Sequence, residues 1–219
     1  MTNKDFQISN NCFDLHVHSH YSNDCKSQPK DILKMAKKIK LSGVAITDHN
    51  TAKFHHEKWK NKELLIIPGV EISTNRGHVI GLGISDTIKK KISVEETIEK
   101  IIELGGLTII PHPFDFTRKG IGRKIKKLDR VVVETLNGSC PLRRFNEKAK
   151  MWAKINNLSE TGGSDAHRIR DIGMAHTVFD NKLETVDELI EEIRKGRTKI
   201  RGTNLSIAEK IVRTFQIHF

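Results

Sequence analysis

Cysteine is scarce in this chain of 219 residues. Cys12, Cys25 and Cys140 are odd in number and show no CxxC spacing. A disulfide framework needs paired cysteines, and a zinc site built from thiolates needs closely spaced ones, so the sequence argues against both. We therefore expect a protein of a reducing cytoplasm.

Aromatic residues and long apolar runs are scarce as well. Aromatic side chains make up 5% of the chain, so the interleaved stacking platform of a single-strand nucleic-acid binder is not expected. No run approaches the roughly 20 apolar residues that cross a bilayer. Residues 1–11 lack the apolar core of a signal peptide. We expect no membrane segment.

Basic residues, in contrast, are abundant. Lys and Arg number 38 against 27 Asp and Glu, which gives a net charge of +11. Such a charge attracts anions, and both phosphorylated small molecules and nucleic acid fit. Many of these lysines follow helical patterns, as in residues 32–40, where they solvate a helix face. We therefore favour a small phosphorylated substrate and keep nucleic acid as the alternative; the oligomeric state stays undetermined.

Strand-like and helix-like patterns alternate along almost the whole chain. The expected strands lie at 12–17, 43–47, 63–73, 77–84, 107–113, 130–138, 158–161, 175–180 and 198–202. The expected helices lie at 29–41, 52–60, 93–106, within 114–129, at 141–155, at 185–196 and from about 204 onward. This alternation predicts a parallel sheet wrapped by helices, in one domain that spans residues 1–219.

The segment DLHVHSHYSND, residues 14–24, carries the first chemical signal. His16 and His18 stand two apart near the end of an expected strand, so their imidazoles project from one face and can hold one ion. His20 and Asp24 follow in the loop. An isolated pair of this kind is more often a polar strand edge, and the metal interpretation depends on what the other strands carry.

Other expected strands also end or begin with His, Asp or Glu. The candidate ligands are His16, His18, Asp24, His49, Glu71, His78, His112, Asp165 and His167. Clustered carboxylates and imidazoles are costly unless cations organise them. Nitrogen and oxygen ligands without sulfur favour Zn, Mn or Fe. Ligands from nearly every strand converge only if the strands close around an axis, so we expect a distorted TIM-like (β/α)7 barrel rather than an open doubly wound sheet.

Five motifs in this order resemble the PHP (polymerase and histidinol phosphatase) family of metal-dependent phosphoesterases. They are DLHVHSHYSND at 14–24, ITDHNT at 46–51, PGVEIST with GHVIG at 68–81, PHPF at 111–114 and GGSDAH at 162–167. The resemblance covers nearly the whole chain. The short spacing between His78 and His112 indicates the compact form of the family, without a large insertion.

The resemblance implies three divalent metal ions, with mixed occupancy by Zn, Mn or Fe allowed. The first ion would be held by His16, His18, Glu71 and Asp165. Glu71 would bridge to a second ion, which His78 and His112 also hold. The third ion would be held by Asp24, His49 and His167.

The implied activity is hydrolysis of phosphomonoesters, such as nucleotides or other small phosphorylated metabolites, through a hydroxide that bridges two metals. Glu71, Asp165 and His112 would act in catalysis by holding the metals. Arg168 would bind the phosphoryl group, because it directly follows His167. Two alternatives stay open: a nuclease that acts on DNA or RNA ends, and a non-catalytic metal-binding interaction module.

Several residues near the motifs have less certain roles. Asp14 and Asp48 are expected to orient imidazoles by accepting a ring N–H, or else to hold backbone N–H groups at strand ends. His20 and His176 are candidates for a proton donor, although exposure of the first and packing of the second are the simpler interpretations. The weaker candidates for phosphate binding, after Arg168, are Arg118, Arg123, Arg143 and Arg144. Glu134 and Asn137, at a strand end, resemble a family position and either contact substrate or support the ligands. Cys25 stays without a role, and His55 and His56 are expected to face solvent.

Overall fold

A computed structural model describes residues 11–57, 59, 63–122, 128 and 130–204. The expected terminal helix beyond 204 and most of the basic segment after residue 122 lie outside these residues.

Nine strands form one continuous sheet in the order β7-β6-β5-β4-β3-β2-β1-β8-β9. Their bounds are β1 Cys12–Val17, β2 Gly43–Ile46, β3 Leu65–Ser73, β4 His78–Leu82, β5 Leu107–Ile110, β6 Val131–Asn137, β7 Glu160–Gly163, β8 Ala175–Val178 and β9 Lys199–Gly202. The first strand agrees with its expected bounds, and the others differ by a few residues at their ends.

The first seven strands curl into a ring that closes between β1 and the end of β7. The N–H of Asp165 donates to the carbonyl of His16 (2.7 Å), and the N–H of His18 donates to the carbonyl of Ala166 (3.0 Å). At the other end, β8 pairs with the start of β1, and the Thr177 hydroxyl hydrogen-bonds to both backbone groups of Gly162. The result is the distorted barrel that the sequence predicts, with β8 and β9 added outside the ring.

Strand direction differs from the expected parallel sheet. β4 runs antiparallel to both β3 and β5, and β8 runs antiparallel to β1 and β9. A short connection of residues 74–77 joins β3 to β4, and such a connection cannot make the crossover that parallel strands require. Because β4 is reversed, its first residue, His78, lies at the same rim as the carboxyl ends of its neighbours.

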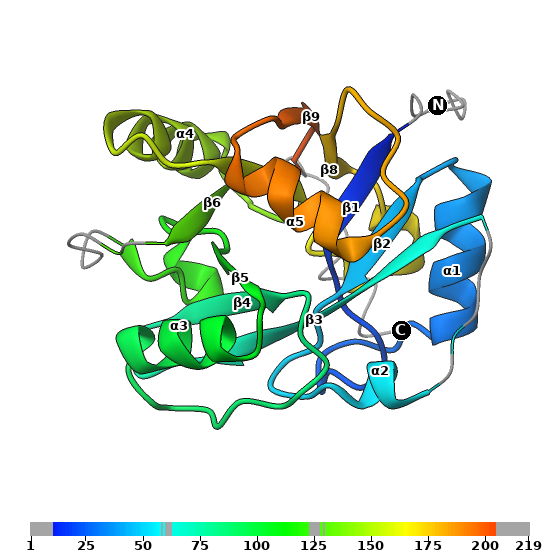
Figure 1. The fold of residues 1–219 in the computed structure, drawn as a ribbon, viewed down its shortest axis with the longest axis horizontal. Coiled ribbons are helices and arrows are strands. Elements are labelled where there is room, and N and C mark those ends of the chain that lie inside the picture. Colours follow the sequence, from blue (N-terminus) through cyan, green and yellow to red (C-terminus); the bar gives the residue numbers. More distant parts are fainter. Residues whose placement is uncertain (1–10, 58, 60–62, 123–127, 129, 205–219) are drawn as a thin grey trace.

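Most of the helices cover the sheet from outside (Figure 1), whereas the buried residues of the helix at 186–194 join the core cluster inside the ring. They are α1 Pro29–Lys38, α2 Lys53–His56, α3 Val94–Glu103, α4 Arg143–Ile155 and α5 Val186–Arg194, with 3-10 turns η1 Phe116–Arg118 and η3 Ile169–Asp171. Thr185 and Glu188 form a capping box that starts α5, and the Ser93 side chain caps α3. Within the described part of the chain, no helix combines the length and apolarity needed to span a membrane.

Irregularities in two strands decide which side chains face the barrel interior. Leu15 of β1 belongs to the core cluster inside the ring, whereas Val17 packs with α1 residues outside it, and the β1–β2 register shifts between them. This shift brings His16 to the inside although it follows Leu15 directly. β6 shows a similar shift between Glu134 and Leu136.

Candidate metal centre

The structure brings all nine candidate ligands together at one rim of the barrel. Each contacts at least one other member of the set, and six of the nine are buried, whereas His49 and His167 are about a fifth exposed and Asp24 is exposed. The ligand roles themselves stay a prediction, but the side chains point toward one another and not apart.

Glu71 lies at the centre of the set. Its Oε1 is 2.9 Å from His78 Nδ1 and 3.1 Å from His112 Nε2. Its Oε2 is 3.0 Å from His49 Nδ1, 3.3 Å from His18 Nε2 and 3.5 Å from His16 Nε2. The two oxygens of one buried carboxylate thus face two different groups of imidazoles, which is the arrangement that a bridging ligand requires.

A second carboxylate, Asp165, faces the imidazoles of β1. Asp165 Oδ1 lies 3.4 Å from His18 Nε2 and 3.7 Å from His16 Nε2, and these two nitrogens are 3.1 Å apart. On the outer side, Asp24 Oδ2 lies 3.4 Å from His49 Nε2 and 3.3 Å from His167 Nε2. His49 therefore reaches both Asp24 and Glu71 and links the outer group to the centre.

The backbone is strained at two of these positions. His112 and Asp165 adopt left-handed φ angles of 58° and 52°. Such a conformation costs a residue other than glycine on the order of 1 kcal/mol or more, and it concentrates at functional sites. Pro111 and Pro113 flank His112 and restrict its backbone further.

Several buried atoms of the set have no hydrogen bond. They are His49 Nδ1, Glu71 Oε2, both ring nitrogens of His78, and His112 Nδ1. Of these, His49 Nδ1 and His78 Nδ1 each lie about 3 Å from a Glu71 oxygen. A buried polar atom without a partner costs free energy. Nitrogen and oxygen atoms about 3 Å apart that do not point at each other are the pattern expected when both point at a shared cation, so these residues fit divalent metal ions.

Comparisons with known proteins identify the family. A family model described as PHP-associated matches residues 143–198. An uncharacterized protein of Methanocaldococcus jannaschii is 34% identical over 200 residues, which are 88% of this chain and 81% of that protein. A second uncharacterized protein of the same organism is 44% identical over 57% of this chain and 80% of its own length. The chain belongs to the PHP family.

Solved structures show the same PHP fold. PsfC from Pseudomonas syringae aligns with a TM-score of 0.65 at 18% identity and covers 95% of this chain and 97% of its own. A protein from Bifidobacterium adolescentis named as a metal-dependent phosphoesterase aligns with a TM-score of 0.56 at 17% identity, over 88% and 97% of the two chains. A lesion-specific endonuclease from Pyrococcus furiosus aligns with a TM-score of 0.61 at 20% identity, over 86% of this chain and 57% of that one.

The histidines of this PHP centre differ in pKa and therefore in charge. Burial acts to lower the pKa of His49, but the facing carboxylates of Glu71 and Asp24 raise it to about 10. The pKa of His16 is likewise raised, because Asp165, Glu134 and Glu71 outweigh burial. His18 differs: burial and the neighbouring His167 lower its pKa to about 3, so its imidazole stays neutral.

These pKa shifts predict that metal binding releases protons. Because the raised pKa values keep His16 and His49 protonated at neutral pH without a cation, a divalent ion must displace those protons to bind. We expect roughly one or more protons to leave per protein at pH 7, and the apparent affinity for Zn or Mn to fall as pH decreases. Isothermal titration in buffers of different ionisation enthalpy measures this; heats that do not depend on the buffer would contradict it.

A second carboxylate system supports the ligands. His16 Nδ1 donates to Glu134 Oε1 (2.9 Å), which directs Nε2 of the same ring toward the cluster. Asn137 Nδ2 lies within hydrogen-bond distance of both Glu134 Oε2 (2.8 Å) and Asp165 Oδ2 (3.2 Å). Glu134 is therefore the carboxylate that orients an imidazole directly, a role that the sequence alone left undecided.

The two aspartates expected to orient imidazoles act differently. Asp48 accepts hydrogen bonds from Ser19 and Ser22, and the Ser22 hydroxyl lies 3.1 Å from His18 Nδ1, so any effect on the ring passes through the serine. Asp14 accepts backbone N–H groups, including those of Ser164 and Gly173. Asp14 thus has the backbone role that was the alternative.

Arg118, which the sequence ranked below Arg168, contacts the centre directly. Its Nη1 donates to Asp165 Oδ2 (2.5 Å), and Asp165 and other nearby carboxylates outweigh burial to raise the pKa of the guanidinium. Arg168, the preferred candidate, directly precedes η3, and its contact with the phosphoryl group stays a prediction. The sequence ranked Arg118 lower because it follows His112 in an irregular loop whose path no pattern specifies.

The remaining candidate residues contact a neighbouring ring or backbone groups. His20 is exposed and lies against the Tyr21 ring, and buried His176 hydrogen-bonds through Nδ1 to the Gly173 carbonyl. Cys25 Sγ lies 3.3 Å from the carbonyl oxygens of both His18 and His167, so it ties two ligand loops together. The expectation that His55 faces solvent is wrong: its Nε2 accepts the N–H of Gly69, at the point where β2 ends beside β3.

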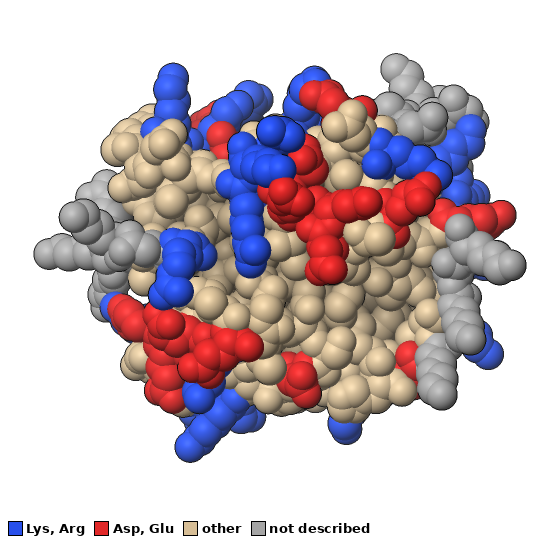
Figure 2. Space-filling view, in the orientation of Figure 1, with Lys and Arg blue, Asp and Glu red and all other residues tan. Residues whose placement is uncertain are grey.

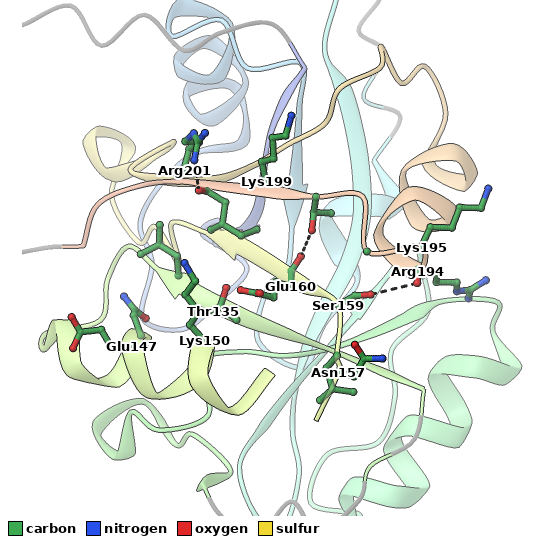
Figure 3. A pocket seen from close by; sticks show the side chains of 16 residues that line it. Thr135, Glu147, Lys150, Asn157, Ser159, Glu160, Arg194, Lys195, Lys199 and Arg201 are labelled. Atoms are coloured by element: carbon green, nitrogen blue, oxygen red, sulfur yellow. Dashed lines mark hydrogen bonds between the residues drawn. The ribbon is translucent and has the colours of Figure 1, made fainter. Parts of the chain in front are cut away.

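A separate cavity of about 770 Å³ lies behind β6, between α4, β7 and β9. Thr135 of β6 lines it, on the opposite side of the strand from Glu134. Figure 3 shows Arg194 and Lys195 directed away from this cavity, whereas Lys150 extends into it from α4. None of the nine candidate ligands lines this cavity, so it is separate from the candidate metal centre.

Proposed function

We propose that this PHP protein is a metal-dependent hydrolase of phosphomonoesters. The observation that carries the proposal is the buried Glu71 carboxylate, whose two oxygens face separate groups of imidazoles without hydrogen-bonding to most of them. The name of the Bifidobacterium adolescentis neighbour supports the same reaction class. Small phosphorylated metabolites, including nucleotides, are the proposed substrates.

Three groups of residues would hold three divalent ions, either Zn, Mn or Fe. They are His16, His18 and Asp165 with Glu71; Glu71 with His78 and His112; and Asp24, His49 and His167. When bound, such ions lower the pKa of water toward neutrality and neutralise charge on phosphoryl oxygens.

The protein's own groups complete the site around these ligands. Glu134 keeps the Nε2 lone pair of His16 directed at the cluster by accepting its Nδ1 proton. Arg118 holds Asp165 through Oδ2 and leaves Oδ1 facing the imidazoles of His16 and His18. The Arg118 guanidinium is partly exposed at the rim, so its other N–H groups are placed to donate to phosphoryl oxygens.

Phosphate release tests the proposal. Protein loaded with Mn or Zn is expected to release inorganic phosphate from an aryl phosphate and from a panel of metabolite phosphates, and His16→Ala is expected to abolish this activity. His20→Ala is the matched control, because His20 is exposed and stacks on Tyr21 outside the ligand set. Absence of turnover across the panel in fully metal-loaded protein would overturn the proposal.

A nuclease acting on DNA or RNA ends is the second candidate, favoured by the net charge of +11. Figure 2 shows one face on which acidic side chains gather over α3 and α5, with Lys and Arg beside them. This face therefore offers no continuous basic surface for a phosphate backbone. A nuclease would lose affinity steeply with salt; we expect a weak salt dependence of KM for the phosphomonoester.

A further inference from the structure

Two phenylalanines and an arginine form a group beside the candidate metal centre. The rings of Phe116, in η1, and Phe145, in α4, meet edge to face with centroids 6.3 Å apart. The Arg144 guanidinium lies over the Phe145 ring, 5.5 Å from its centroid. Phe116 is 72% exposed, although large apolar side chains are usually covered.

Two short connections place this pair next to Asp165. Phe116 begins the same 3-10 turn that ends at Arg118, and Arg118 donates to Asp165. On the other side, Asn146 follows Phe145 and hydrogen-bonds to both backbone groups of Asn137. The Asn137 side chain in turn contacts Asp165. Both rings are therefore anchored to the same candidate ligand from different elements.

The loop that carries Phe116 is also fixed to the centre. The N–H of His78 donates to the carbonyl of Lys119 (3.0 Å), and the N–H of Gly120 donates to the carbonyl of Asp115 (2.9 Å). A side chain at Gly120 would lie 2.6 Å from the His112 carbonyl, so the loop packs tightly against that ligand. Phe116 thus presents an aromatic surface from a fixed position on the rim, and not from a loose surface loop.

We propose that the Phe116 ring stacks on the base of a nucleoside monophosphate whose phosphoryl group lies at the metal centre. An exposed aromatic ring two residues from Arg118, which donates to Asp165, matches a substrate with a flat aromatic group at one end and a phosphoryl group at the other. Phe145, held by Arg144 on one side and by the α4 core cluster on another, supports Phe116 edge-on. This inference rests on the proposed phosphomonoesterase function and specifies its substrate class.

The separation between Phe116 and the metal centre favours a nucleotide over a simple aryl phosphate as the substrate. The length of the Arg118 side chain separates η1 from Asp165. A ring bonded directly to the ester oxygen would end short of Phe116, whereas the ribose of a nucleoside monophosphate supplies the spacer. One aromatic platform serves one base, which agrees with the low aromatic content of the chain.

The test compares kcat/KM for three phosphomonoesters: a nucleoside 5′-monophosphate, an aryl phosphate and glycerol phosphate. The wild type is expected to prefer the nucleotide. Phe116→Ala is expected to lower the ratio of nucleotide to glycerol phosphate by about 5- to 150-fold, the range for loss of one base–aromatic contact. Phe116→Tyr, which keeps the ring, is expected to preserve the ratio. Binding of a fluorescent nucleoside monophosphate to Phe116→Ala should weaken by a similar factor.

Ile155→Ala is the matched control, because Ile155 is 74% exposed and lies at the far end of α4. It should leave the substrate ratio unchanged. An unchanged ratio in Phe116→Ala would overturn the inference, as would a change only in oligomeric state measured by light scattering, which would assign Phe116 to a contact between copies. Absence of hydrolysis of all three substrates would instead refute the phosphomonoesterase function itself.

Discussion

Glu71→Gln is expected to lower metal-dependent phosphate release by more than about 100-fold. Changes to residues that only support metal ligands cost 10- to 100-fold in affinity or activity, and Glu71 contacts the cluster itself, so its loss should exceed that range. The amide that replaces the carboxylate carries no charge and offers one oxygen, although five imidazoles surround Glu71 within 3.5 Å. We also expect less Zn or Mn bound per protein, measured by elemental analysis after gel filtration.

Glu184→Gln controls for the loss of one carboxylate. Glu184 is exposed and pairs with Lys182, far from the rim, so metal content and activity should match the wild type. If Glu71→Gln bound as much metal as the wild type, Glu71 would not be a ligand. If it bound less metal but kept full activity, the bridge would not take part in the reaction.

Gly163→Ala is expected to damage both stability and metal binding. An added methyl group at this position would lie 2.5 Å from His16 Cβ and 3.0 Å from Glu134 Oε1. Both neighbours belong to the centre, and β1 approaches β7 this closely only because residue 163 has no side chain. Overpacking of this kind costs roughly 1–3 kcal/mol, so Tm should fall by about 3 to 10 °C. Affinity for Zn should fall with it, because His16 must move.

Gly105→Ala is the control for Gly163→Ala, because it introduces backbone strain without displacing a ligand. Gly105 has a φ of 79° and no atom within 4 Å of the position of an added methyl group. The substitution should cost about 1 kcal/mol through strain alone and leave metal affinity intact. Equal affinity losses in the two variants would show that His16 is not held by its contact with residue 163. Calorimetry and zinc titration measure both quantities on the same samples.

Much of the centre was predictable because its chemistry is local in sequence. His16 and His18, or Asp165 and His167, stand two apart near the ends of expected strands, and the repetition of such pairs along the chain indicates ligands although a single pair does not. The helices expected at 93–106 and 185–196 form close to those bounds, and their caps at Ser93 and Thr185 are local as well, since a cap involves residues only three apart. The PHP family followed from the order of such local motifs.

Other features depend on which strands become neighbours. The reversed direction of β4 places His78 at the rim, and the sequence pattern of an antiparallel strand does not differ here from that of a parallel one. The register shift in β1 turns His16 inward beside Leu15, although simple alternation would place them on opposite faces. The same limit applies to His55, whose partner Gly69 lies on another strand.

The residue types and the order of the candidate ligands were thus determined by the sequence alone, because short spacings and strand ends carry that information. Only the tertiary structure decided that Glu134 orients His16, that Arg118 holds Asp165, and that Phe116 meets Phe145. These contacts join residues that are 47 or 118 positions apart, or depend on the path of an irregular loop. No local pattern specifies such pairs, because they form only when the barrel closes.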